Sequence, residues 1–174
     1  MSLPEEPLPV LPSFSFLYCD PHRLVEAVEA VEAFMGSPVM ESGDYPFDMS
    51  DYYIQEMGGE QRRKWYCFAL QDPSALAGWK LRCIEVEARC GGEGSRMVNI
   101  DPGYLDHGKL VLASCKYAPD KIYLSQGVYA HKCLRYRFGS FHGPDHSFAD
   151  FIDGRFNGFF LEAKRLYRKM LRER

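Results

Sequence analysis

The sequence lacks the features that mark membrane, exported and disulfide-rich proteins. No run approaches the roughly 18 consecutive apolar residues that a membrane span requires. The N-terminus has Glu5 and Glu6 among prolines, whereas a signal peptide has a basic start and an apolar stretch. The six cysteines include no C-x-x-C pair, which favours buried free thiols over a disulfide framework. We therefore expect a cytoplasmic protein with no membrane segment.

What remains is the composition of one folded domain. The chain has 174 residues, of which 46% are hydrophobic and 26% charged. This length allows one substantial core and is too short for two comfortable domains. Four prolines by Pro12 predict a stiff, extended tail over residues 1–12. We expect a single α+β domain over residues 13–174.

Charge is distributed unevenly along the chain. Residues 1–60 hold twelve acidic residues and one basic residue, whereas residues 61–174 hold twelve acidic and twenty basic residues. In one interpretation, folding brings the two halves together and their charges neutralise one another across the surface. In the other, a basic face binds an anionic ligand, or the two halves dock onto copies of the chain and form a homo-oligomer.

Two segments follow the same pattern of strand, Asp-Pro and helix. An alternating, aromatic-rich run at Phe14–Cys19 precedes Asp20-Pro21, and apolar residues at helical spacing follow as far as Gly36. A second strand at Lys64–Leu70 leads through Asp72-Pro73 into another helix. The repeated pattern predicts duplicated topology.

Residues between and after these units supply further strands. Val39–Tyr45 fits a strand and Asp51–Gln55 a turn, and Arg96–Ile100 fits a strand after the second helix. The resulting order, β-α-β-β-α-β, is that of a ferredoxin-like split βαβ core in an α+β domain. A fold of this kind does not by itself fix an activity.

The C-terminal part predicts an extension of this core by a β-hairpin and a terminal helix. We favour a helix at Lys109–Lys116, although the segment also fits a strand. A hairpin of Lys121–Leu124 and Val128–Phe138 follows. One face of the hairpin is apolar, and the other carries basic and aromatic residues: Tyr129, His131, Cys133, Arg135 and Arg137. An apolar stripe over residues 156–170 predicts a terminal helix that packs on the sheet.

The segment Gly103–Leu110 nearly matches the phosphate-binding loop G-x-x-x-x-G-K-[ST]. Its last residue, Leu110, has no hydroxyl for the Mg²⁺ that bridges the phosphates. No D-x-x-G or N-K-x-D segment is present to recognise guanine. A turn in which Gly103 and Lys109 have local roles is therefore favoured over GTP binding.

The densest group of acidic residues lies at Glu41–Glu60, interleaved with aromatic residues. Clustered carboxylates can bind a divalent cation or share a proton in acid–base catalysis. A solvated acidic loop is the more common outcome, and no cofactor is required by the sequence. The interleaved aromatics suggest that the segment packs down and lines a cleft. Its candidate metal ligands are Asp48 and Asp51.

Two other groups are candidates for metal or anion binding. His142 and His146 have a metal-like spacing, but Gly143-Pro144 breaks any helix that would align the two imidazoles. The basic hairpin face with Arg135 and Arg137 is of a kind that ferredoxin-like sheets use for phosphate-bearing partners. No RNA-recognition aromatic motif accompanies it and the pI is near 6.0, so a small anionic ligand is favoured over nucleic acid.

Several short segments are distinctive when taken together: Pro46-Phe47-Asp48, Asp51-Tyr52-Tyr53, Glu56-Met57-Gly58, Val98–Leu105, Lys109–Ala113, Lys121–Leu124, Gly127–Ala130 and Gly139-Ser140-Phe141. Together they resemble an uncharacterised bacterial family known as domain of unknown function 4416, over about Phe14 to Leu171. The resemblance implies a bacterial origin and supplies no activity, although some members carry the label GTP-binding protein. In that family another residue usually stands at the position of Gly108, which argues against a phosphate loop.

We predict a cleft between residues 48–56 and 99–109 that binds a small anionic or phosphate-bearing ligand, in a binding protein or an enzyme of unknown reaction. Its predicted residues are carboxylates, aromatic walls and polar or cationic groups: Asp48, Glu56, Asp101, Tyr52, Tyr53, Asn99, Lys109 and Lys116. The alternative is a non-catalytic interaction or self-association module. RNA binding through Arg135 and Arg137 and GTP binding are weaker alternatives.

Overall fold

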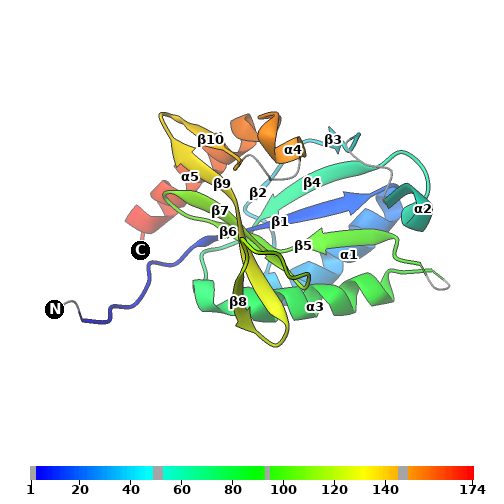
Figure 1. Cartoon of the computed structure of the whole chain (residues 1–174), viewed down its shortest axis with the longest axis horizontal. Helices are drawn as coiled ribbons and strands as arrows, with labels where there is room; N and C mark the ends of the chain where they lie inside the picture. The colour runs from blue at the N-terminus through cyan, green and yellow to red at the C-terminus, as the bar shows by residue number, and fades with distance from the viewer. Residues whose placement is uncertain (1–2, 49–52, 93–94, 145–148) are drawn as a thin grey trace.

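The computed structural model describes residues 3–48, 53–92, 95–144 and 149–174. In these residues, ten strands form one antiparallel sheet: β1 (Leu11–Tyr18), β2 (Met40–Glu41), β3 (Tyr45–Pro46), β4 (Arg62–Cys67), β5 (Val98–Asp101), β6 (Gly103–Leu105), β7 (Lys109–Ser114), β8 (Ile122–Ser125), β9 (Val128–Arg137) and β10 (Ser140–His142). The helices are α1 (Pro21–Met35), α2 (Ile54–Met57), α3 (Leu76–Arg89), α4 (Ala149–Ile152) and α5 (Asn157–Arg172). The chain is therefore an α+β protein (Figure 1). None of the helices in the described ranges has the length and apolar character to cross a membrane.

Both Asp-Pro helices form where the sequence predicts them. The Asp20 carboxylate accepts a hydrogen bond from the backbone N–H of His22 at 2.9 Å, and α1 ends at Gly36, whose φ is +78°. The Asp72 carboxylate caps the backbone N–H of Ser74 at 2.7 Å, in a short 3-10 turn that leads into α3. These caps satisfy backbone donors that have no partner in the first turn of a helix.

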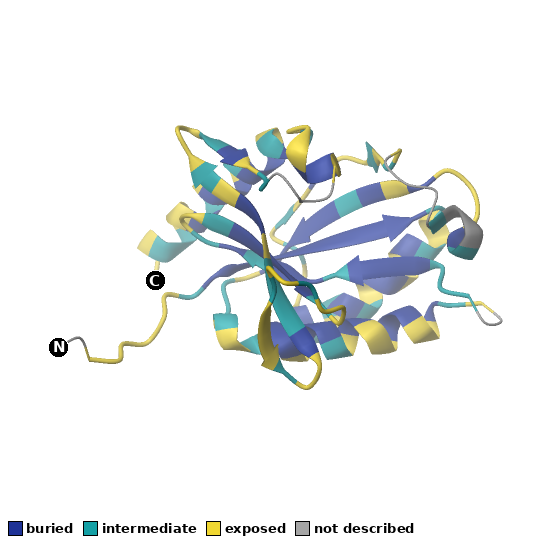
Figure 2. Cartoon of the chain, viewed as in Figure 1, coloured by how far each residue is buried: buried dark blue, intermediate teal, exposed yellow. Residues whose placement is uncertain are grey.

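Helices cover both faces of the sheet, so the protein has two hydrophobic clusters. Side chains alternate along β1, which sends Phe14 and Phe16 into the cluster beneath α1 and α3. On the other face, Trp65 of β4 is fully buried against the aromatic rings of α4 and α5, including that of Phe160 at 4.9 Å. Figure 2 shows β1 buried along its whole length between these layers.

The segment Lys109–Lys116, for which we favoured a helix, is strand β7. Leu110 and Leu112 pack in the cluster on the α5 side, whereas Val111 and Ala113 pack in the cluster on the α1 and α3 side. The sequence of a strand that is buried on both faces is a continuous apolar run, in which apolar and polar residues do not alternate. Such a run cannot be told from a buried helix by periodicity alone.

A β-bulge changes the predicted faces of the hairpin. Leu110 pairs with Leu134, but the next residue, Val111, pairs with Lys132. The extra residue on β9 is Cys133, which is fully buried in the α5-side cluster. The prediction that Cys133 shares one face with Arg135 and Arg137 is therefore wrong, because a bulge interrupts the two-residue period.

The N-terminal residues join the sheet before residue 13. Residues 3–9 have no helix or strand and are mostly exposed, but Val10 forms an antiparallel bridge with Gln71. Strand β1 begins at Leu11, inside the segment for which the sequence predicted a tail. The extended region is therefore shorter than its proline content suggests.

The sheet forks beside β1. The C-terminal half of β1 pairs with β5, and its N-terminal half pairs with β6, so the two strands follow one another along the same edge. Pro102 lies at the bend between them, and its carbonyl accepts a hydrogen bond from the N–H of Ala113 at 2.8 Å. Beyond this point β7 runs on with β9, and within the described chain β5 pairs with no strand other than β1. The fork leaves one edge of β5 without a neighbouring strand.

Candidate functional site

A cavity of about 450 Å³ lies at this fork. Its walls come from β5, the end of β7, β9, α3 and the region around α4. The residues that line it include Phe47, Tyr53, Arg63, Lys80, Ile84, Glu87, Arg96, Asn99, Asp101, Ser114, Lys116, Lys121, His131, Cys133 and Phe151. The volume falls in the range of small-molecule sites, roughly 300–1,000 Å³.

Two side chains of α3 satisfy the backbone at the free edge of β5. The N–H of Ile100 donates to the Glu87 carboxylate at 2.6 Å, and the Lys80 ammonium donates to the Ile100 carbonyl at 2.8 Å. Without these bonds the edge would be open to pairing with another strand. Lys80 also forms an ion pair with Asp101 at 3.5 Å.

The charged groups at this edge of β5 shift one another's pKa values. Burial alone would lower the pKa of Lys80, but the Asp101 and Glu87 carboxylates outweigh it and raise the pKa above its ordinary value. Burial raises the pKa of Glu87 despite the nearby Lys80 ammonium. Lys80 is therefore held in its charged form at the base of the cavity.

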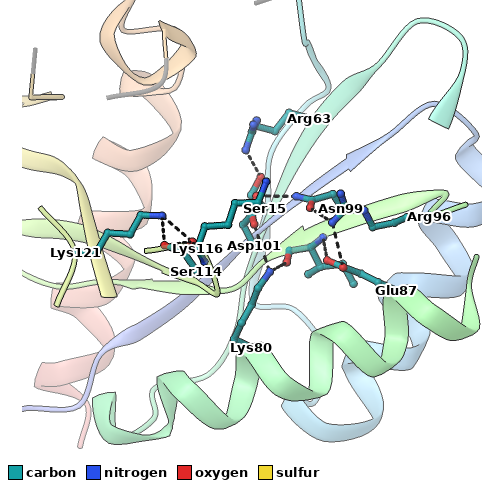
Figure 3. A network of polar contacts seen from close by, with 11 residues as sticks. Ser15, Arg63, Lys80, Glu87, Arg96, Asn99, Asp101, Ser114, Lys116 and Lys121 are labelled. Carbon is teal, nitrogen blue, oxygen red and sulfur yellow. Dashed lines mark hydrogen bonds and ion pairs between the residues drawn. The ribbon is translucent and has the colours of Figure 1, made fainter. Parts of the chain in front are cut away.

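A chain of hydrogen bonds runs from β5 to α2. The Asn99 amide donates to the Asp101 carboxylate at 2.8 Å, and the Arg96 guanidinium donates to the Asn99 oxygen at 2.7 Å (Figure 3). Arg96 also donates to the Glu56 carboxylate at 2.9 Å. Burial would lower the pKa of Arg96, but the hydrogen bond to Glu56 and the charge of Glu87 raise it. The network fixes both β5 side chains that face the cavity.

Aromatic rings and guanidiniums line the wall next to α4. The Arg63 guanidinium lies 5.3 Å from the ring centre of Phe47 and 5.7 Å from that of Phe151. It pairs with the buried Asp150 carboxylate at 3.0 Å and donates to the Ser15 hydroxyl at 2.7 Å. Burial raises the pKa of Asp150, although the positive charge of Arg63 opposes this. Arg63 is thus neutralised by a partner that lies behind the wall.

The opposite wall, at the end of β7, is cationic. The Lys121 ammonium donates to the Ser114 hydroxyl at 2.7 Å and to the Lys116 carbonyl at 2.9 Å, both neutral oxygens. Among the ion pairs of the described residues, none includes Lys121. Burial lowers the pKa of Lys121; the charge of Asp101 opposes this shift and that of Lys116 adds to it. Burial, with the charge of Lys121, also lowers the pKa of His131.

The structure brings five of the predicted site residues to the cavity or its wall. Tyr53, Asn99, Asp101 and Lys116 line the cavity, and Glu56 bonds to a guanidinium that lines it. The segments around residues 53–56 and 99–101 therefore lie close together.

Other predicted residues lie elsewhere. Asp48 has a 62% exposed side chain and pairs with Arg155 at 3.0 Å. Lys109 begins β7, at the end of the strand opposite to Ser114, and pairs with Asp106. Three predicted residues lie outside the described ranges: Asp51, Tyr52 and His146.

Arg135 and Arg137 of the basic hairpin face do not line the cavity, whereas His131 and Cys133 do. Arg135 and Arg137 are exposed on β9, and His142 is exposed on β10. Tyr129 packs against the ring of Tyr123 on β8, with ring centres 5.3 Å apart. Arg135, Arg137, His142 and Tyr129 are therefore separate from the site at the fork.

The segment that resembles a phosphate loop is a tight β-hairpin between β6 and β7. The Asp106 carboxylate accepts hydrogen bonds from the backbone N–H groups of Gly108 at 2.8 Å and Lys109 at 2.9 Å. The Lys109 ammonium also pairs with Asp106. A phosphate loop needs free N–H groups and a following helix. Here a carboxylate occupies the donors and a strand follows.

Lys80, Glu87 and Arg63 are central to the site, but they were not among the site residues predicted from the sequence. Lys80 and Glu87 follow Leu76 and Cys83 at a spacing of four residues, so they lie on the buried stripe of α3. Charged residues on an apolar helix stripe are the signal that could have identified them. In the described part of the chain, no group of three or more His, Cys, Asp or Glu side chains is arranged to hold a metal ion.

Comparison with known proteins identifies the family of the chain. The family model described as domain of unknown function (DUF4416) matches residues 9–167, which confirms the resemblance seen in the sequence. No curated protein and no solved structure matches the chain.

Proposed function

This chain belongs to that family of unknown function, and we propose that its cavity binds a small anionic ligand, as a binding protein or as an enzyme. The observation that carries the proposal is the Lys121 ammonium, which lines the cavity and is bonded to two neutral oxygens. The other cations on the opposite walls, Lys80, Arg63 and Arg96, have carboxylate partners. An anion would supply the charge partner that Lys121 lacks among the described residues.

We further propose that the cavity is built on a ferredoxin-like split βαβ core. The antiparallel order β5-β1-β4-β2, with a helix after β1 and another after β4, supports this assignment. Strands β6 to β10 and α5 would then be an extension of that core. The ligand would bind where core and extension separate.

Sulfate and phosphate should stabilise the protein against heat, and the Lys121→Met variant should lose this effect. Removal of one charge-assisted hydrogen bond should weaken anion binding about tenfold. Thermal-shift measurements against inorganic anions, nucleotides and sugar phosphates would test this, because a ligand that binds only the folded state raises the melting temperature.

Lys132→Met is the matched control, since Lys132 is exposed on β9 and does not line the cavity. It should keep the anion response of the wild-type protein. An equal response in both variants, or no stabilisation by any anion in a broad panel, would remove the proposal.

Self-association is a second candidate function, favoured by the exposed edge of the extension. Among the described strands β8 pairs only with β9, and its residues Ile122 and Tyr123 are 71% and 58% exposed. The nearby ring of Tyr117 is 73% exposed. An apolar edge strand of this kind is a surface on which a second chain can pair.

If the β8 edge forms a dimer, light scattering should show twice the monomer mass, and Ile122→Lys should return the protein to a monomer. Lys132→Asp, on the neighbouring strand, should leave the mass unchanged. A wild-type protein that is monomeric at high concentration and at every ionic strength would rule this function out. RNA binding through Arg135 and Arg137 is a weaker proposal, because these exposed side chains lie outside the cavity.

A further inference from the structure

The cavity lining offers both hydrogen-bond acceptors and donors. The Asp101 carboxylate on β5 is 28% exposed, whereas the Glu87 carboxylate beside it is 9% exposed. Asp101 is therefore the more accessible hydrogen-bond acceptor of these two lining carboxylates. Lys116 and Lys121, which also line the cavity, are donors. A ligand in the cavity therefore meets both a carboxylate acceptor and cations.

The Asp101 carboxylate retains capacity for further hydrogen bonds. One oxygen pairs with Lys80 at 3.5 Å, and the other accepts from Asn99 at 2.8 Å. An ionised carboxylate has about four lone-pair sites. These two contacts therefore hold Asp101 in place and leave acceptor sites for a ligand. Because Lys80 balances its charge, Asp101 can accept a hydrogen bond without strongly repelling an anion elsewhere in the cavity.

The donors that fit Asp101 are hydroxyl groups. An ammonium group on the ligand would lie next to Lys80, whose pKa is raised and which stays charged, and near the guanidinium of Arg96. A neutral O–H group donates to the carboxylate without this repulsion. Elsewhere in the lining, the side chains of Phe47, Ile84 and Phe151 provide apolar contact for a carbon skeleton.

Resting on the proposed function, we propose that the ligand is a phosphorylated polyol. Its phosphate binds at Lys121 and Lys116, and its hydroxyl groups donate to Asp101. Two lysines on one side suit a dianion better than a carboxylate, because each ammonium can donate to a separate phosphate oxygen.

A matched pair of probes tests this on the full-length, unmodified chain. Glycerol 3-phosphate and propyl phosphate share a phosphate and three carbons, and differ in the two hydroxyl groups. Isothermal titration calorimetry should show glycerol 3-phosphate binding about tenfold more tightly, as expected for a hydrogen bond to a charged acceptor. Inorganic phosphate should bind more weakly than glycerol 3-phosphate.

The Asp101→Ala variant should abolish the difference between the two probes, because the acceptor for the hydroxyl groups is then gone. If this variant fails to fold, the comparison of glycerol 3-phosphate with propyl phosphate on the wild-type chain still tests the inference. Equal or tighter binding of propyl phosphate to the wild type would overturn the polyol inference and leave the proposed anion site intact. If none of the three phosphates binds, the anion site and the polyol inference both fail.

Discussion

The Arg63→Met variant should lose about 3–5 kcal/mol of unfolding free energy at pH 7. Arg63 is 6% exposed and pairs with Asp150, which is 2% exposed, at 3.0 Å. Methionine fills a similar volume, but it leaves the Asp150 carboxylate buried without its counter-charge. It also removes the donor to the Ser15 hydroxyl. Urea unfolding of the wild type and the variant would measure the loss.

The loss should shrink as the pH falls. Burial already raises the pKa of Asp150 above its ordinary value of 3.8, and Arg63 opposes this rise. Without Arg63 the pKa of Asp150 in the folded state rises further. Above that pKa the buried carboxylate is charged, and the variant loses unfolding free energy. This loss is relieved as the pH falls through the raised pKa, because the carboxyl group then becomes neutral. The two unfolding curves should therefore approach each other towards pH 4.

Arg62→Met is the matched control, because Arg62 is the neighbouring residue on β4 and is exposed. Its loss should stay within about 0.5 kcal/mol. The double variant Arg63→Met with Asp150→Asn should recover most of the stability, since no charge is then buried alone. A pH-independent loss in the single variant would mean that packing, and not the charge of Asp150, explains the effect.

Local signals in the sequence were enough to place the first part of the fold. Asp20, Pro21 and Gly36 mark the start and end of α1, and each acts within a few residues of its own position. The apolar stripe of α5 is equally local. By contrast, the strand β7 and the bulge at Cys133 depend on what packs against both faces of the sheet. That information is absent from any short window of the sequence.

The site was predicted in part for the same reason. Asn99 and Asp101 alternate with apolar residues on one strand, so their shared face follows from the two-residue period. Lys109 and Lys121 are both basic and near turns, and the sequence analysis placed Lys109 in the cleft. In the structure Lys121 lines the cavity instead. Residues 109–114 form strand β7 and not a helix, so Lys109 lies at the end of the strand that is far from the cavity. The error in one element therefore changed which lysine was expected to line the cavity.

The Gly103→Ala variant should destabilise the protein by about 3 kcal/mol, because the fork requires close contact between β6 and β7. A Cβ atom on Gly103 would overlap the carbonyl oxygen of Val111 and a methyl group of Leu112, and would lie 3.1 Å from the Leu112 Cα. Backbone atoms cannot move aside as a flexible side chain can, so β7 would have to shift.

Such a shift would displace Ser114, which bonds to Lys121, so anion binding should weaken together with stability. Gly43→Ala is the control, because a Cβ there meets nothing within 4 Å and its φ lies outside the left-handed region. It should change the unfolding free energy by less than about 0.5 kcal/mol. Wild-type stability and anion response in Gly103→Ala would show that the β6–β7 spacing can relax without altering the cavity. The cationic wall would then not depend on the geometry of the fork.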